Sequence, residues 1–156
     1  MSRAFVKEDD AAAEPPIPER FISAAPNRVT PRGARLIVQA IAQLKEELTR
    51  SITADAAAGY RRDLRYWHAR LASMQVVLPN SVADVVGFGT RITIRRGSVT
   101  SEVTIVGEDE ADSPAGLIAW TAPLARALDG VEVGDVVEFE AGGRREPITV
   151  TAITRE

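Results

Sequence analysis

The sequence predicts an α+β protein, in which an antiparallel helical hairpin (a short coiled coil) precedes an antiparallel β domain with one short helix. Apolar residues recur at helical spacing in two consecutive stretches before residue 79. After Pro79 the pattern changes to short alternating runs that are rich in β-branched residues, as strands are. Gly97-Ser98 and Gly142-Gly143 separate neighbouring runs and are typical of hairpin turns.

Residues 1–28 are predicted to form an extended or disordered leader. Few large apolar residues and the prolines at positions 15, 16, 18 and 26 cannot build a core or a long helix. We expect Phe21 and Ile22 to anchor this leader by packing on the segment that follows. Residues 1–10 lack an apolar stretch and carry three consecutive acidic residues, so they do not resemble a secretory signal.

Residues 29–78 are predicted to form the helical hairpin. Thr30 followed by Pro31 is a typical helix start, with a hydroxyl cap before proline at the first helical position. The two apolar stripes, with spacings of three and four, are Ile37, Ile41, Leu44 and Leu48, then Tyr60, Leu64, Trp67, Leu71 and Met74. The break between them at residues 51–55 is short, so the helices fold back on each other, with one continuous helix as the alternative. Pro79-Asn80 is expected to end the second helix.

Residues 79–156 are predicted to form the β domain. Strands are expected at residues 85–86, 90–94, 102–106, 117–121, 136–140 and 148–153. Residues 123–128 predict a short helix that Pro123 opens.

Composition excludes several classes of chemistry. The chain has no cysteine and one histidine, His68, which excludes disulfides, thiolate zinc sites, cysteine nucleophiles and histidine-rich metal sites. Gly87-Phe88-Gly89 lacks the rest of a phosphate-loop pattern. The acidic residues at 108–112 lack the spacing of a calcium loop, and we interpret them as a solvated turn. We therefore expect no catalytic residues, metal or cofactor.

Charge divides the chain into two unlike parts. Residues 31–77 hold eight basic and four acidic residues, whereas residues 78–156 hold seven basic and thirteen acidic ones. A basic middle and an acidic end suggest two units with different partners or faces, or simply two solvated surfaces. With a pI near 5.3, the chain is a poor candidate for binding nucleic acid by itself, so contact with DNA or RNA would be indirect. It contains no apolar run of about 18 residues to span a membrane, and we expect a cytoplasmic protein.

Several segments resemble the Gre family of bacterial transcription elongation factors. Residues 105–112, with the sequence IVGEDEAD, and residues 122–130, with APLARALDG, resemble the signature of the family's C-terminal domain. The turn VGDVV at 133–137 follows at a compatible spacing. Residues 29–33 resemble the entry into the family's N-terminal coiled coil, in its GreB-like branch, and residues 74–77 resemble its exit. Together these segments cover most of residues 29–154.

The resemblance implies a partner and a docking edge. It implies an FKBP-like C-terminal domain that grips RNA polymerase at the rim of its secondary channel, with the coiled coil directed toward the active site. By analogy, the polymerase-binding residues would be Trp120, Thr121, Ala122, Pro123, Leu124 and Arg126. Thr121 and Ala122 depart from the family, which usually has an acidic residue and a serine there. Trp120 and Leu124 could instead fill the core.

The hairpin tip departs most from the family. Members that stimulate transcript cleavage carry two acidic residues there, because a second Mg²⁺ needs oxygen ligands. The tip of this chain, formed by Ser51, Ile52, Thr53 and Asp55, has one carboxylate. A first helix over residues 32–49 would span roughly 27 Å, which is some three turns shorter than the family's arms.

These observations predict a monomeric factor that binds polymerase and modulates elongation or initiation without stimulating cleavage. The alternatives are an active cleavage factor and a generic interaction module that dimerises through its hairpin. A prolyl isomerase would need an aromatic-lined pocket, and Phe88, Trp120 and Phe139 are too few aromatic residues to line one.

Overall fold

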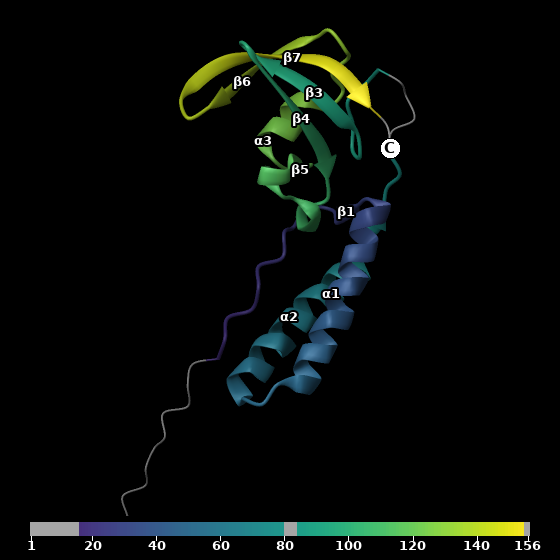
Figure 1. Cartoon of the computed structure of the whole chain (residues 1–156), viewed down its shortest axis with the longest axis vertical. Coiled ribbons are helices and arrows are strands. Elements are labelled where there is room, and N and C mark those ends of the chain that lie inside the picture. Colours follow the sequence, from purple (N-terminus) through teal and green to yellow (C-terminus); the bar gives the residue numbers. More distant parts are fainter. Residues whose placement is uncertain (1–15, 80–83, 155–156) are drawn as a thin grey trace, which may run out of the picture.

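The structure, a computed structural model that describes residues 16–79 and 84–154, consists of a helical hairpin that projects from a curled β-sheet (Figure 1). Helix α1 (Pro31–Arg50) and helix α2 (Ala54–Ser73) form the hairpin, and strands β3 to β7 with helix α3 (Pro123–Leu128) follow. The predicted α+β class is confirmed.

Both long helices begin at threonine caps. The Thr30 hydroxyl accepts a hydrogen bond from the Gly33 amide at 3.0 Å, and Pro31 occupies the first helical position. The Thr53 hydroxyl accepts from the Ala56 amide at 3.2 Å. Only residues 51–53 connect the helices, so the continuous-helix alternative is wrong.

The predicted apolar stripes meet between the two helices. The apolar cluster of the hairpin holds the buried residues Val29, Ile37, Ile41 and Leu64, with the partly buried Leu44, Leu48, Trp67, Leu71 and Met74 around them. Each helix has 20 residues and is therefore about 30 Å long.

The end of α2 differs from the prediction. The helix ends at Ser73 rather than at Pro79, and strand β2 (Gln75–Val76) pairs in parallel with strand β1 (Arg28–Val29). The Gln75 amide donates to the Asn27 carbonyl at 2.8 Å. Because this pairing joins segments nearly fifty residues apart, no local pattern at the helix end predicts it.

Residues 16–27 of the leader lie alongside the hairpin and have no regular secondary structure. Phe21 is 86% exposed and Ile22 is 41% exposed, so the expected apolar anchor is wrong. Charged side chains make the contacts instead: Glu19 binds Arg65, and the Arg20 guanidinium lies 3.7 Å from the centroid of the Tyr66 ring.

The sheet has five strands in the order β5-β4-β3-β7-β6. Their bounds are β3 (Arg91–Arg96), β4 (Val99–Val106), β5 (Leu117–Ala119), β6 (Val136–Ala141) and β7 (Arg144–Thr154). Neighbours pair antiparallel except β5, which pairs in parallel with β4. The sheet is therefore mixed rather than purely antiparallel. Two short 3₁₀ turns (Glu108–Glu110 and Ser113–Ala115) connect β4 to β5 and bring the chain back beside Thr104–Val106, the last three residues of β4, so that β5 runs in the same direction. The expected strand at residues 85–86 is only an isolated bridge between Val85 and Glu132.

Helix α3 covers one face of the sheet and closes the second apolar cluster (Figure 1). Its buried members are Val86, Ile92, Ile94, Ile105, Ala125, Leu128, Ile148 and Val150. Because side chains alternate across a strand, Arg91 and Thr104 lie on the opposite face of the sheet. Among the helices of the described ranges, none is long and apolar enough to cross a membrane.

Candidate functional site

The expected docking edge lies where β5 ends and α3 begins. Pro123 and Arg126 are exposed, and Ala122 is the residue that caps the helix. Leu124 is partly buried and packs against the apolar cluster of the sheet, which is the core role left open by the sequence. The edge thus offers a proline and an arginine to solvent on a short, well-packed helix.

Trp120 has both a packed and an accessible side. It packs against the sheet's cluster, while the Arg28 guanidinium lies 4.7 Å from its ring centroid. One hollow of about 210 Å³ borders the ring together with Phe88, Ala125 and Arg126, and a second of about 240 Å³ borders it together with Ala25 and Thr121. Its buried indole Nε1 finds no hydrogen-bond acceptor among the described residues.

A chain of polar contacts joins the docking edge to the hairpin. The Thr121 hydroxyl donates to Glu108 Oε1 at 3.0 Å, and Glu108 Oε2 lies 3.5 Å from Arg70 Nη2. Arg70 Nε donates to Asp109 Oδ2 at 2.5 Å, and the Tyr66 hydroxyl donates to Asp109 Oδ1. The Arg70 side chain is 2% exposed. Because this arginine belongs to α2 and both acids precede β5, these contacts fix the orientation of the expected docking edge relative to the hairpin.

Glu110 makes a second set of contacts between the hairpin and the sheet, at the start of α1. We call these contacts, together with those of Arg70 and Tyr66 to Glu108 and Asp109, the joint. Glu110 accepts from the Thr30 amide at 3.0 Å, from the Thr30 hydroxyl at 2.5 Å and from the Gly107 amide at 3.1 Å. Arg32 Nη1 lies 4.0 Å from its Oε1. Glu110 is 4% exposed. The expectation of a solvated turn is therefore wrong for residues 108–110, because these acids meet donors from the hairpin that lie distant in the sequence.

Tyr66 is the titratable group most perturbed at the joint. Burial raises the pKa of its phenol to about 12, and its hydrogen bond to Asp109 acts in the same direction. Both causes favour the neutral phenol, which can donate to the carboxylate. The Tyr66 hydroxyl therefore keeps its proton through the physiological pH range.

The hairpin tip carries a single carboxylate. Asp55 lies in the first turn of α2 and is exposed, and the Ile52 side chain is 98% exposed. The Ser51 hydroxyl donates to the Leu48 carbonyl at 2.7 Å, and Thr53 caps α2.

One turn back from the tip, Glu46 and Glu47 lie 3.4 Å and 3.7 Å from the guanidinium of Arg50. Within the described ranges, no group of three or more histidine, cysteine, aspartate or glutamate residues could hold a metal ion.

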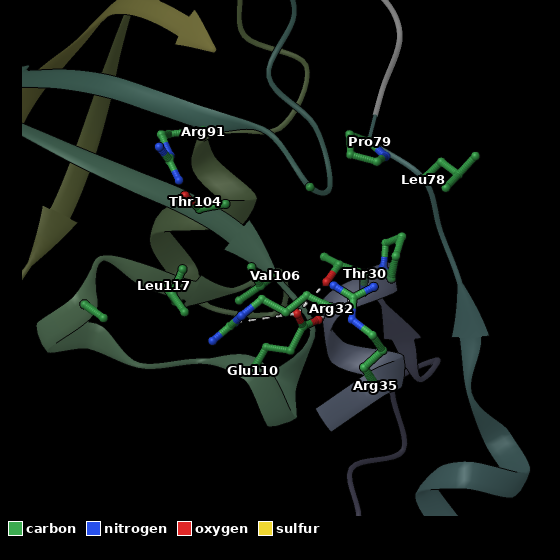
Figure 2. A pocket seen from close by; sticks show the side chains of 13 residues that line it. Thr30, Arg32, Arg35, Leu78, Pro79, Arg91, Thr104, Val106, Glu110 and Leu117 are labelled. Carbon is green, nitrogen blue, oxygen red and sulfur yellow. Dashed lines mark hydrogen bonds and ion pairs between the residues drawn. The ribbon is translucent and has the colours of Figure 1, made fainter. Parts of the chain in front are cut away.

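A pocket of about 590 Å³ lies between the base of the hairpin and the sheet face opposite α3. Figure 2 shows Arg32 and Arg35 at the start of α1 and Arg91 on β3, with Val106 and Leu117 beside them. No pattern in the sequence places these three arginines together. A spacing of three between Arg32 and Arg35 was the available local signal, but the approach of β3 depends on the tertiary fold.

Comparisons with known proteins show which sequences this chain resembles. The family described as "Transcription elongation factor, GreA/GreB, C-term" matches residues 80–155. The chain is 36% identical over 121 residues to transcription elongation factor GreA of Alkalilimnicola ehrlichii, covering 70% of this chain and 77% of that protein. It is 30% identical over 125 residues to GreA of Cereibacter sphaeroides, covering 75% and 83%.

Two solved structures are similar at lower identity. The GreA factor homolog 1 of Thermus thermophilus is 19% identical with a TM-score of 0.41, covering 81% of this chain and 97% of that one. The GreA/GreB factor of Nitrosomonas europaea is 22% identical with a TM-score of 0.43, covering 81% and 98%. The sequence relatives, matched over more than two thirds of their length, show that this chain belongs to the GreA/GreB family of transcription elongation factors.

Proposed function

We propose that this chain binds bacterial RNA polymerase at the rim of the secondary channel and modulates elongation or initiation without stimulating transcript cleavage. Family membership supports the partner. A monomer in the cytoplasm, with at most indirect contact to DNA or RNA, fits this role. The alternatives are a cleavage-active factor and a module that dimerises through its hairpin.

The docking edge is suited to a protein partner. Pro123 and Arg126 are exposed beside the partly buried Trp120, and proline, arginine and tryptophan together offer apolar, cationic and aromatic contacts. Thr121 links this edge through Glu108 to Arg70 of α2. A partner that binds the edge would therefore also set the direction of the hairpin.

The single carboxylate at the tip carries the proposal that cleavage is not stimulated. Asp55 alone cannot supply the pair of oxygen ligands that a second Mg²⁺ requires. Glu46 and Glu47 are already paired with Arg50 on the preceding helix. Ile52, the most exposed large apolar residue described, occupies the tip instead. The arm would thus occupy space in the channel without delivering a metal site.

The test is binding to core RNA polymerase, followed by RNA cleavage in backtracked complexes with the same sample. We expect the unmodified chain to bind and to leave the cleavage rate at its intrinsic level. Pro123→Glu should weaken binding by about tenfold or more, because it places a charge in the centre of the docking edge.

Pro114→Glu is the matched control, since Pro114 is also exposed and lies at the start of a 3₁₀ turn away from α3. It should bind as the unmodified chain does. Robust cleavage would contradict the assignment of the tip. Absence of binding, or a mass that doubles with concentration in the absence of polymerase, would favour the dimerising module instead.

A further inference from the structure

The leader turns charged side chains toward the hairpin and leaves a large apolar one in water. Arg65 Nε of α2 donates to Glu19 Oε1 at 3.0 Å. The Arg20 guanidinium lies 3.7 Å from the centroid of the Tyr66 ring, also on α2. Phe21, the next residue, is 86% exposed. The leader is therefore held by its polar groups, while burial of the phenyl ring against another surface would be favourable.

A second attachment brings the leader to the docking edge. The buried Asn27 donates from its side-chain nitrogen to the Arg70 carbonyl of α2 at 2.8 Å. Ala25 borders the hollow of about 240 Å³ beside Trp120. Phe21 thus lies between an anchor on the middle of α2 and a segment that touches the docking edge, as the course of the leader beside α2 shows (Figure 1).

Phe21 is close enough to the docking edge to share one interface with it. Ala25 is four positions further along the chain, and an extended chain advances at most about 3.6 Å per residue, so the two Cα atoms lie within about 15 Å. Each side of a standard protein interface buries about 800 Å², which corresponds to a disc with a radius of about 16 Å. A partner that covers the docking edge over such an area would also meet Phe21 and Ile22, which is 41% exposed.

The side chains around Trp120 indicate what the partner surface should carry. Arg28 and Arg126 are exposed beside the Trp120 ring, and Asp129 is the carboxylate that lines the same hollow. Among the described residues, no carboxylate lies within 4.0 Å of the nitrogens of either guanidinium. A fitting surface is therefore acidic opposite these arginines and apolar opposite Phe21.

We propose that the leader is part of the surface that binds RNA polymerase, with Phe21 and Ile22 in an apolar recess next to the polymerase surface that meets Pro123. This rests on the proposed function, which supplies the partner, and adds a contact region outside the sheet. Glu19 and Arg20 already hold the leader on α2, so binding orders it at a lower cost in conformational entropy than it would a free tail.

The experiment measures the affinity of the full chain for immobilised bacterial core RNA polymerase by surface plasmon resonance. Phe21→Ser should weaken binding by about fivefold or more, because the burial of a phenyl ring is lost. The exposed position of Phe21 predicts an unchanged circular dichroism spectrum and urea midpoint.

Val99→Ser is the matched control. Val99 is 64% exposed and begins β4, roughly 24 Å from Val106 at the end of that strand, where β5 leads into the docking edge. Its affinity should equal that of the unmodified chain. Hydroxyl-radical footprinting gives a second measurement: polymerase should protect Phe21 from oxidation and leave Val99 unprotected.

The outcomes separate this proposal from the proposed function. If Pro123→Glu weakens binding while Phe21→Ser does not and Phe21 stays unprotected, the leader is no part of the interface and polymerase binding stands. Tighter binding of Phe21→Ser would show that the leader shields the docking edge, and equal losses in Phe21→Ser and Val99→Ser would show a non-specific contact; either overturns the proposal. An unmodified chain that does not bind overturns the proposed function and this proposal with it.

Discussion

Arg70 and Glu110 are charged residues whose side chains are almost fully buried, at 2% and 1% exposed. Burial of a charge is tolerated only with close partners, and both residues have them. Arg70 meets Asp109 and Glu108, and Glu110 accepts two hydrogen bonds from Thr30. At the scale of single residues, the contact between the hairpin and the sheet is therefore polar rather than apolar.

Tyr66 gives this joint a measurable pH dependence. Burial and Asp109 raise its folded pKa to about 12, above the ordinary value near 10. The stabilisation is fully present below about pH 10 and is lost as the pH rises through the folded pKa. We expect the free energy of unfolding to fall between pH 10 and pH 12 more steeply in the unmodified chain than in Tyr66→Phe.

Phenolate absorbance near 295 nm checks the assignment directly. Tyr60→Phe, the matched control, should retain the ionisation near pH 12, and Tyr66→Phe should lose it. If Tyr66→Phe still shows that ionisation, Tyr66 is not the perturbed group.

At the scale of elements, α1 and α2 have equal lengths and similar threonine caps but unlike surroundings. Gly33 in α1 faces the Glu110 carboxyl, and an added Cβ would lie 2.3 Å from its Cδ. At Gly59 in α2 the same position is open, with no heavy atom within 4 Å apart from its chain neighbours and the backbone of its own helix. Local helix propensity treats these two glycines alike, whereas tertiary packing does not.

Replacing the two glycines by alanine should therefore change stability in opposite directions. Gly59→Ala should raise the free energy of unfolding by about 0.5–1 kcal/mol, the usual gain in a helix. Gly33→Ala should lower it by about 1–3 kcal/mol, since the methyl group displaces a buried, hydrogen-bonded carboxylate. Urea unfolding of both variants measures the difference. A stabilised Gly33→Ala would contradict the close approach of Glu110.

At the scale of the whole molecule, two apolar clusters are held together by one ionic joint. The hairpin cluster surrounds Ile37 and Leu64, and the sheet cluster surrounds Ile92 and Leu128. Trp67 belongs to the first and Trp120 packs against the second. Single-tryptophan variants can therefore report on each half separately.

Arg70→Met should weaken the coupling between these halves. It leaves Asp109 and Glu108 without their buried cation, at a cost of about 3 kcal/mol. With Arg70 intact, the Trp67→Phe and Trp120→Phe proteins should unfold in urea at midpoints that differ only by the effect of each substitution itself. Adding Arg70→Met should separate the two midpoints.

Arg62→Met is the control for this experiment. Arg62 pairs with Asp63 in the same helix, and both side chains are partly exposed, so its loss should cost less than about 1 kcal/mol. It should leave the two midpoints together. Coincident midpoints in Arg70→Met would show that Thr30 and Glu110 suffice to couple the halves.

Much of the fold could be predicted from local pattern. The cap at Thr30 and the short helix at residues 123–128 were located by sequence, because a cap and a proline act within a few residues. The apolar stripes of the hairpin were located in the same way. The end of α2 at Ser73 and the parallel direction of β5 were not, since both depend on strands that pair across the chain.

The sequence by itself determined the class of the protein: two amphipathic helices, a set of strands, their turns, and motifs that match the GreA/GreB family. It also determined that the tip has one carboxylate, because that is a matter of composition. Only the tertiary structure decided that Glu108, Asp109 and Glu110 are the joint and that three arginines share a pocket. The physical reason is that a buried charge needs a close partner, and the position of a partner distant in the sequence follows from the fold rather than from neighbours in the chain.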